Sequence, residues 1–136
     1  PVLRRGLEDA AARLGLRAAV LDIERVDQLA AAFEWVSRQS VDALHVMADP
    51  ILAGHSRAIF KMALDYRLPT MAGNATWVNV GALMSYTIDL IAIVRRSAYY
   101  IREILRGADP ATLPIEQPTE VSLAINMATA RALGLR

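Results

Sequence analysis

Apolar residues recur at helical spacing at the start of the chain. The pattern over residues 2–14 predicts a helix, and Gly15 is a plausible stop for it. Residues 16–23 contain a short apolar run and read as a strand. Asp27 can cap a second helix that extends to about residue 39. The first forty residues therefore predict a helix, a strand and a helix.

Short strands and helices continue to alternate through the middle of the chain. The apolar runs at residues 41–47, 67–72 and 81–86 predict three strands, and the pattern over residues 52–66 predicts a helix. The residues between the second and third of these strands, 73–80, read as a loop followed by a helical turn.

The longest predicted helix covers residues 89–105. It is apolar on several sides, so it needs more than one partner surface. Residues 108–118 contain three of the six prolines and read as an extended connector. A last strand is predicted over residues 119–126, and a short helix over residues 128–133 closes the chain.

Repeated alternation of strands and helices favours a mostly parallel sheet. We therefore predict an α/β fold with three layers, in which helices cover both faces of the sheet. A chain of 136 residues fits one domain, and residues 1–136 are interpreted as a single α/β lobe.

The composition narrows the functional classes. Hydrophobic residues make up 54% of the chain, which excludes a disordered segment. The formal net charge is +1 and the arginines form no basic stripe, so we expect no nucleic-acid partner. The absence of cysteine excludes disulfides and thiolate metal sites. The opening residues read as helix and not as a signal peptide.

No motif in the sequence indicates catalysis or a cofactor. Gly-x-Ser-x-Gly, a glycine-rich phosphate loop and a dinucleotide fingerprint are all missing. His45 and His55 have no further metal ligands at suitable spacing, which favours structural roles for both. Asp49 and Asp89 could converge as a pair of carboxylates, but no general-acid environment can be read around them. We therefore predict no catalytic residue, no metal and no cofactor.

Polar and aromatic residues follow the predicted strands. Ligands of open α/β sheets bind outside the carboxyl ends of the strands. Those ends carry Asp49 with Pro50, then Asn74, then Tyr86 with Thr87. The helices that follow offer unpaired backbone N–H groups, which suit an anionic ligand. Ordinary structural roles remain open as well, because aspartate caps helices and asparagine favours turns.

Trp77 follows the loop at residues 73–76, also at the end of a predicted strand. It can form an aromatic wall over a ligand or pack in the hydrophobic core. The sequence leaves both interpretations open.

Four segments resemble the substrate-binding proteins of ABC transporters, a family that includes binders of tryptophan and other amino acids. They are residues 41–50 with His55, residues 67–69, residues 81–86, and residues 104–119 with a tail at 123–135. The last is the most specific. It reads Ile-Leu-x-Gly-x-x-Pro-x-x-Leu-Pro-x-Glu-Gln-Pro-Thr, and the tail combines Leu-x-Ile-Asn with Thr-Ala-x-Ala-Leu-Gly-Leu.

The resemblance implies a type I periplasmic-binding-protein fold, in which two α/β lobes close on a ligand at the hinge. This chain resembles the second lobe with its returning C-terminal segment, and the first lobe is expected to be absent from it. By the same resemblance, the helix from Asp89 to Leu105 packs on that other lobe. An isolated chain is therefore expected to form a homo-oligomer through this helix.

The resemblance also implies a function in ligand binding and not in catalysis. The chain would be the solute-binding component of an ABC importer, would hold an amino acid or an aromatic or carboxylate solute in the cleft between the lobes, and would serve an ABC permease. It would work in the periplasm, or outside the cytoplasm on a membrane anchor. The implied ligand-binding residues are Asp49, Pro50, Asn74, Trp77, Tyr86 and Thr87.

Relatives differ from this chain at two of these positions. They often carry an acidic residue near Asn74, which suits a ligand ammonium group, whereas Asn74 is neutral. They also commonly have glycine where this chain has Thr87.

Two other functions stay open from the residues alone. The effector-sensing domain of a transcriptional regulator uses the same bilobal architecture, but it needs a DNA-binding helix-turn-helix that these residues lack. A small α/β enzyme would need a catalytic motif. The fold by itself does not separate the three functions.

Overall fold

The computed structural model describes residues 2–135. The helices and strands follow one another along the chain in the order α1 (Val2–Arg13), α2 (Gln28–Arg38), β1 (Leu44–Val46), α3 (Pro50–Gly54), α4 (Ser56–Asp65), β2 (Thr70–Ala72), the 3-10 helix η1 (Ala75–Val80), β3 (Met84–Ile88), α5 (Leu90–Leu105), the 3-10 helix η2 (Pro110–Thr112), β4 (Val121–Ile125) and α6 (Met127–Leu133).

Four strands form one sheet in the order β1-β2-β3-β4. The pairs β1–β2 and β2–β3 are parallel, and β4 runs antiparallel to β3. Val46, Ala72, Ser85 and Ala124 lie side by side across the sheet. The predicted α/β fold with a mostly parallel sheet is confirmed.

The hydrophobic core lies between the sheet and a layer of helices. Strand residues alternate between the two faces of a sheet, so Val46, Ala72 and Ser85 share the face that is buried. The central helix of the layer, α4, contacts α2, α6 and η1, and its Ile59 and Phe60 are almost fully buried in the core. Burying this apolar face is the main source of stability for elements this short.

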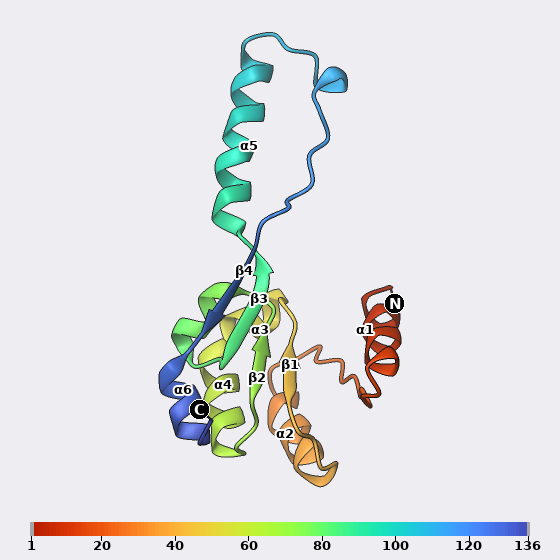
Figure 1. Cartoon of the computed structure of the whole chain (residues 1–136), viewed down its shortest axis with the longest axis vertical. Helices are drawn as coiled ribbons and strands as arrows, with labels where there is room; N and C mark the ends of the chain where they lie inside the picture. The colour runs from red at the N-terminus through yellow and green to blue at the C-terminus, as the bar shows by residue number, and fades with distance from the viewer. Residues whose placement is uncertain (1, 136) are drawn as a thin grey trace.

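The opposite face of the sheet, here called the outer face, is more open. Tyr86 lies directly opposite Leu123 on the antiparallel strand pair, and Ile88 lies opposite Val121. All four side chains are exposed. Helix α1 stands apart from the sheet, beyond β1 (Figure 1).

Helix α5 and the segment that returns from it to β4 project from the rest of the molecule, as Figure 1 shows. We call residues 90–120 the arm. No helix or strand of the described chain packs extensively against α5, and none of its residues is buried. The predicted excess of apolar surface on this helix is therefore present in the structure.

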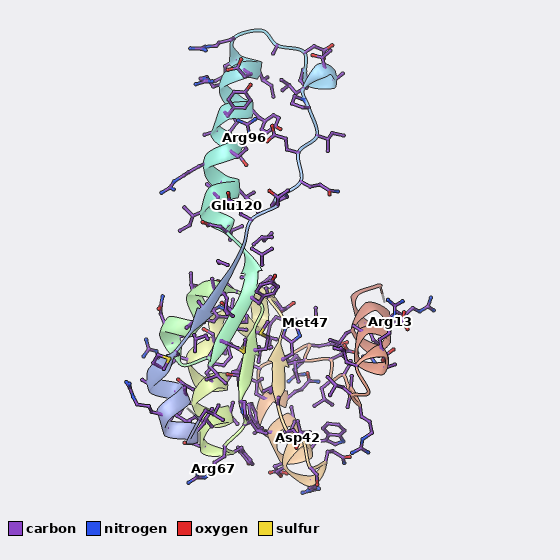
Figure 2. The ribbon with its side chains drawn as sticks, viewed as in Figure 1. Arg13, Asp42, Met47, Arg67, Arg96 and Glu120 are labelled. Carbon is purple, nitrogen blue, oxygen red and sulfur yellow. The ribbon has the colours of Figure 1, made fainter. Side chains whose placement is uncertain are left out.

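The arm is held together by a small polar and aromatic cluster. Arg96, midway along α5 (Figure 2), forms an ion pair with Glu116 of the return segment, and one of its hydrogen bonds measures 2.7 Å. The guanidinium also lies 3.9 Å from the centre of the Tyr99 ring. The hydroxyl of Tyr100 donates to the carbonyl of Pro114 at 2.8 Å. These contacts join the two sides of the arm.

Two sequence predictions about secondary structure are wrong. Residues 16–23 form no strand, because no strand of the described chain pairs with them and an apolar run alone does not make a ladder. The helix predicted over residues 52–66 is two helices, α3 and α4, separated at His55. Gly54 precedes the break, and glycine is a poor helix former.

Within the described residues, no helix is both long enough and apolar enough to cross a bilayer.

Candidate ligand-binding site

The parallel strands β1, β2 and β3 all end toward the same side of the sheet. The loop after β1 leads into α3, the loop after β2 leads into η1, and β3 leads directly into α5. The ends of β1 and β2 lie level, because Val46 pairs with Ala72, and Ala72 pairs with Ser85; β3 continues past Ser85 to Ile88. This side of the sheet is the edge at which open α/β sheets bind ligands, and we call it the candidate site.

The first two loops touch at Gly73. Its backbone N–H donates to the carbonyl of Val46 at 2.8 Å. A Cβ atom at this position would lie 2.5 Å from the backbone nitrogen of Ala48 and 3.1 Å from the carbonyl carbon of Met47. Only glycine allows so close an approach of two main chains, and it fixes the loop after β1 against the loop after β2.

Asp49 begins the helix that follows β1. Its backbone is extended, and its Oδ1 atom accepts hydrogen bonds from the backbone N–H groups of Ile51 at 2.7 Å and Leu52 at 3.4 Å. Pro50 occupies the first helical position, where its fixed φ angle fits and its missing N–H costs nothing. Asp49 thus keeps a second carboxylate oxygen on an exposed side chain.

Asn74 begins η1 in the same way. Its Oδ1 atom accepts from the backbone N–H of Thr76 at 2.9 Å and from the Thr76 hydroxyl at 2.7 Å. The side chain is half-buried beside the loop that Gly73 fixes. The structure therefore brings Asp49, Pro50 and Asn74 to the same edge.

Trp77 lies below this edge, in the core. It is only 6% exposed, and its ring packs against Phe60 with 5.8 Å between the ring centres. Of the two interpretations that the sequence left open, the structure shows core packing. The indole supports η1 from beneath, and thereby supports Asn74.

Tyr86 and Thr87 point to opposite faces of β3, because successive strand residues alternate. Tyr86 is 62% exposed on the outer face. Thr87 is half-buried on the same face of the sheet as Ser85. Its carbonyl accepts a 3.5 Å hydrogen bond from the hydroxyl of Ser122. The two residues cannot both face one small ligand from the same side of the sheet.

Sequence reasoning missed two residues at this edge. Gly73 controls how closely the loops approach, and a glycine directly after a strand is a signal that could have pointed to it. Ser85 is fully buried, and its hydroxyl has no hydrogen-bond partner among the described residues. Only the alignment of β3 with β2 reveals that burial, so no sequence signal marked it.

Metal binding has no support in the described residues, which contain no group of three or more potential metal ligands. His45 lies on the edge strand β1, and desolvation lowers its pKa, so the imidazole is neutral at pH 7. His55 sits at the break between α3 and α4.

The most strongly perturbed ionisable groups lie on the arm and not at the candidate site. Hydrogen bonds from Arg96 hold the pKa of Glu116 below its usual range, and the same pair raises the pKa of Arg96. Desolvation raises the pKa of Tyr100. The ion pair is exposed, so its role is to shape the arm and not to activate a proton donor.

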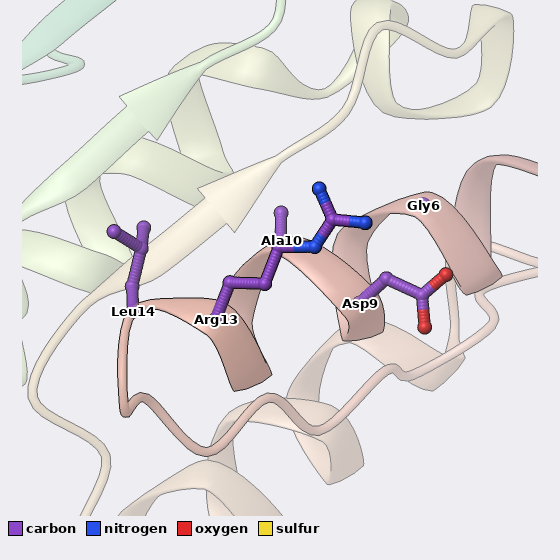
Figure 3. A pocket seen from close by; sticks show the side chains of 5 residues that line it. All are labelled: Gly6, Asp9, Ala10, Arg13 and Leu14. Atoms are coloured by element: carbon purple, nitrogen blue, oxygen red, sulfur yellow. The ribbon is translucent and has the colours of Figure 1, made fainter.

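A hollow of about 450 Å³ lies along α1, far along the chain from the strand ends. It is lined by Gly6, Asp9, Ala10, Arg13 and Leu14 (Figure 3). All five residues belong to one helix and its end, so the hollow is an open surface and shares no residue with the candidate site.

The family of the chain follows from comparison with known proteins. The profile of the ABC transporter substrate binding protein family matches residues 3–136. The chain belongs to this family. The resemblance seen in its sequence is thereby confirmed, and it extends to the region before residue 41, which the four similar segments do not reach.

Three relatives show the breadth of the likeness. A tyrosine-binding protein of Clostridioides difficile (strain R20291) is 25% identical over 96 residues, which are 71% of this chain and 28% of that protein. A conserved domain protein from Vibrio cholerae has a TM-score of 0.87 and 23% identity, with 99% of this chain and 45% of that chain covered. An ABC domain from Streptococcus pneumonia in complex with L-Trp has a TM-score of 0.86 and 22% identity, with 98% and 45% covered.

A ligand-free, open substrate-binding protein with adhesive properties from Clostridium difficile is also similar. Its TM-score is 0.74 and its identity 20%, over 99% of this chain and 45% of that one. This chain therefore spans less than half the length of the solved structures it resembles. Because these sequence identities are between 20% and 23%, the similarity to the solved structures establishes the fold alone.

Proposed function

We propose that this chain contributes one wall of the ligand site in a solute-binding protein of an ABC importer. The observation that carries the proposal is the family match over residues 3–136, combined with a candidate site where that fold binds ligands. In this proposal the sheet and its helices form one lobe. The arm and its exposed apolar side belong to the surface that meets the other lobe.

The proposed ligand is an amino acid or a related aromatic or carboxylate solute. One relative is named a tyrosine-binding protein, and another was solved in complex with L-Trp. The candidate site offers matching chemistry, since it combines the carboxylate of Asp49 with the amide of Asn74. Tyr86, exposed in the middle of β3, can stack on an aromatic ligand.

The residues we propose for the ligand site are Asp49, Pro50, Asn74, Tyr86 and Thr87. Because Tyr86 and Thr87 face opposite sides of β3, we expect one of them to touch the ligand directly and the other to shape the opening. Trp77 takes part from below, as the support of η1.

The proposed mechanism is binding without chemistry. A ligand held between two lobes favours the closed state by its higher affinity for that state, and a permease can distinguish closed from open. The protein would act outside the cytoplasm, where an importer collects its solute. No step in this mechanism needs a catalytic residue or a cofactor.

We also propose that the arm is an association surface in the isolated chain. Apolar side chains are exposed along the whole of α5, including Ile91, Val94 and Leu105. A second copy of the chain can cover this surface when the other lobe does not.

A thermal-shift screen of the full-length gene product tests the proposed function. Amino acids and aromatic acids are added one at a time at millimolar concentration. A specific ligand present at about 100 times its Kd stabilises the folded state by about 2.7 kcal/mol, so Tm rises by several degrees. A folded protein whose Tm responds to none of these solutes contradicts the proposal.

A further inference from the structure

Hydrogen bonds fix the orientation of the Asn74 amide. The backbone N–H of Thr76 can only donate, so the atom that accepts from it at 2.9 Å must be the amide oxygen. The Thr76 hydroxyl donates to the same oxygen at 2.7 Å. Turning the amide over would set two donors face to face and would leave the N–H of Thr76 without an acceptor.

The fixed amide leaves its nitrogen, Nδ2, facing away from η1 with two N–H groups. Within the described part of the chain, Nδ2 makes no hydrogen bond. The side chain is half-buried at the edge where the strands end, and the main chains on either side are locked by the contact between Gly73 and Ala48. Asn74 therefore presents a preoriented pair of donors and no free acceptor.

Asp49, on the adjacent loop, offers an acceptor where Asn74 offers donors. Its Oδ1 is engaged by two N–H groups of α3, and its Oδ2 is the remaining acceptor. No ion pair neutralises its carboxylate among the described residues. One loop thus offers N–H donors, and its neighbour offers negative charge.

We propose that Asn74 determines the polarity of the bound ligand, by donating from Nδ2 to the carboxylate or carbonyl of the solute. This inference rests on the proposed function. A zwitterion fits when its carboxylate faces Asn74 and its ammonium faces Asp49. An amine without a carboxylate leaves the Asn74 donors unpaired. An acid without an ammonium group has no positive charge to pair with the carboxylate of Asp49.

The replacement Asn74→Asp tests this assignment, because it changes the donor and keeps the cap. Aspartate accepts from the N–H of Thr76 as asparagine does, but its second oxygen is an acceptor with negative charge. The matched control is Asn79→Asp, which makes the same change at an exposed position of η1. Protection of the Thr76 amide from hydrogen exchange verifies that the cap persists in Asn74→Asp.

Binding is measured by calorimetry on the full-length gene product with two sets of probes. They are tryptophan, tryptamine and indole-3-propionate, and tyrosine, tyramine and 3-(4-hydroxyphenyl)propionate. The wild-type protein should bind a zwitterion at least about tenfold more tightly than the corresponding amine or acid. Asn74→Asp should lose about tenfold or more for the zwitterion and gain for the amine, while Asn79→Asp should match the wild type.

Two results overturn the inference, and they differ in what else they overturn. If the wild-type protein binds a zwitterion and the Kd of Asn74→Asp for it is within about twofold of the wild-type value, Asn74 does not bind the carboxylate. The proposed function then stands. If the wild-type protein binds neither zwitterion, the assignment to aromatic amino acids fails, and the inference fails with it.

Discussion

In sedimentation velocity, the isolated 136-residue chain is expected to self-associate across micromolar concentrations. It exposes 10123 Å², whereas a compact monomer of its mass exposes about 7000 Å². Large apolar side chains on α5 contribute to this exposed surface, among them Leu105, which is 82% exposed. A surface of this kind is stabilised when a second apolar surface covers it.

The double replacement of Ile91 and Val94 by glutamate should reverse this association. The two positions are one turn apart on α5 and lie on the same side of it. Two buried charges without partners should weaken association by about 2 kcal/mol or more, which is about thirtyfold in Kd. Glutamates at Leu14 and Leu16, which are also exposed but lie outside the arm, are the control. If the wild-type chain stays monomeric, the arm is not an association surface.

Gly73→Ala is expected to destabilise the protein and to weaken its ligand site together. The added Cβ would lie 2.5 Å from the nitrogen of Ala48, which is main chain and cannot rotate away. Relief requires the loops after β1 and β2 to separate, at a cost of about 1–3 kcal/mol. Because these loops carry Asp49 and Asn74, ligand affinity should fall by about tenfold or more.

Denaturant unfolding and calorimetry on the full-length gene product measure the two effects. Gly54→Ala is the matched control, because a Cβ added at Gly54 would meet no heavy atom within 4 Å beyond its chain neighbours and its own helix, and the backbone there is helical. It should be neutral or slightly stabilising. Equal stability of Gly73→Ala and Gly54→Ala would show that the two loops separate without cost, and that their contact does not hold the site.

Local patterns in the sequence were sufficient for most of the fold. Strands β1 to β4 lie where short apolar runs end at polar or turn-forming residues, and α5 lies where helical spacing is longest. The strand expected over residues 16–23 failed because a strand is defined by its neighbour, and no strand of the described chain pairs with this segment. The break at His55 was missed because the apolar spacing continues across it.

The candidate site was predictable only in part. Asp49 and Asn74 begin helical segments after parallel strands, so their place at the sheet edge follows from topology and capping preferences. The depth of Trp77 depends on its packing against Phe60, and the importance of Gly73 depends on a contact with another loop. Such tertiary properties are not encoded in local spacing.

Hydrogen–deuterium exchange with bound ligand shows whether the carboxyl ends of β1, β2 and β3 form a ligand site. The full-length gene product is compared with and without saturating L-Trp or L-Tyr. We expect slower exchange at residues 48–52, 74–77 and 87–92, and unchanged exchange along α1, whose hollow lies outside the site. Protection along α1, with none at the three strand ends, would show that the ligand binds elsewhere.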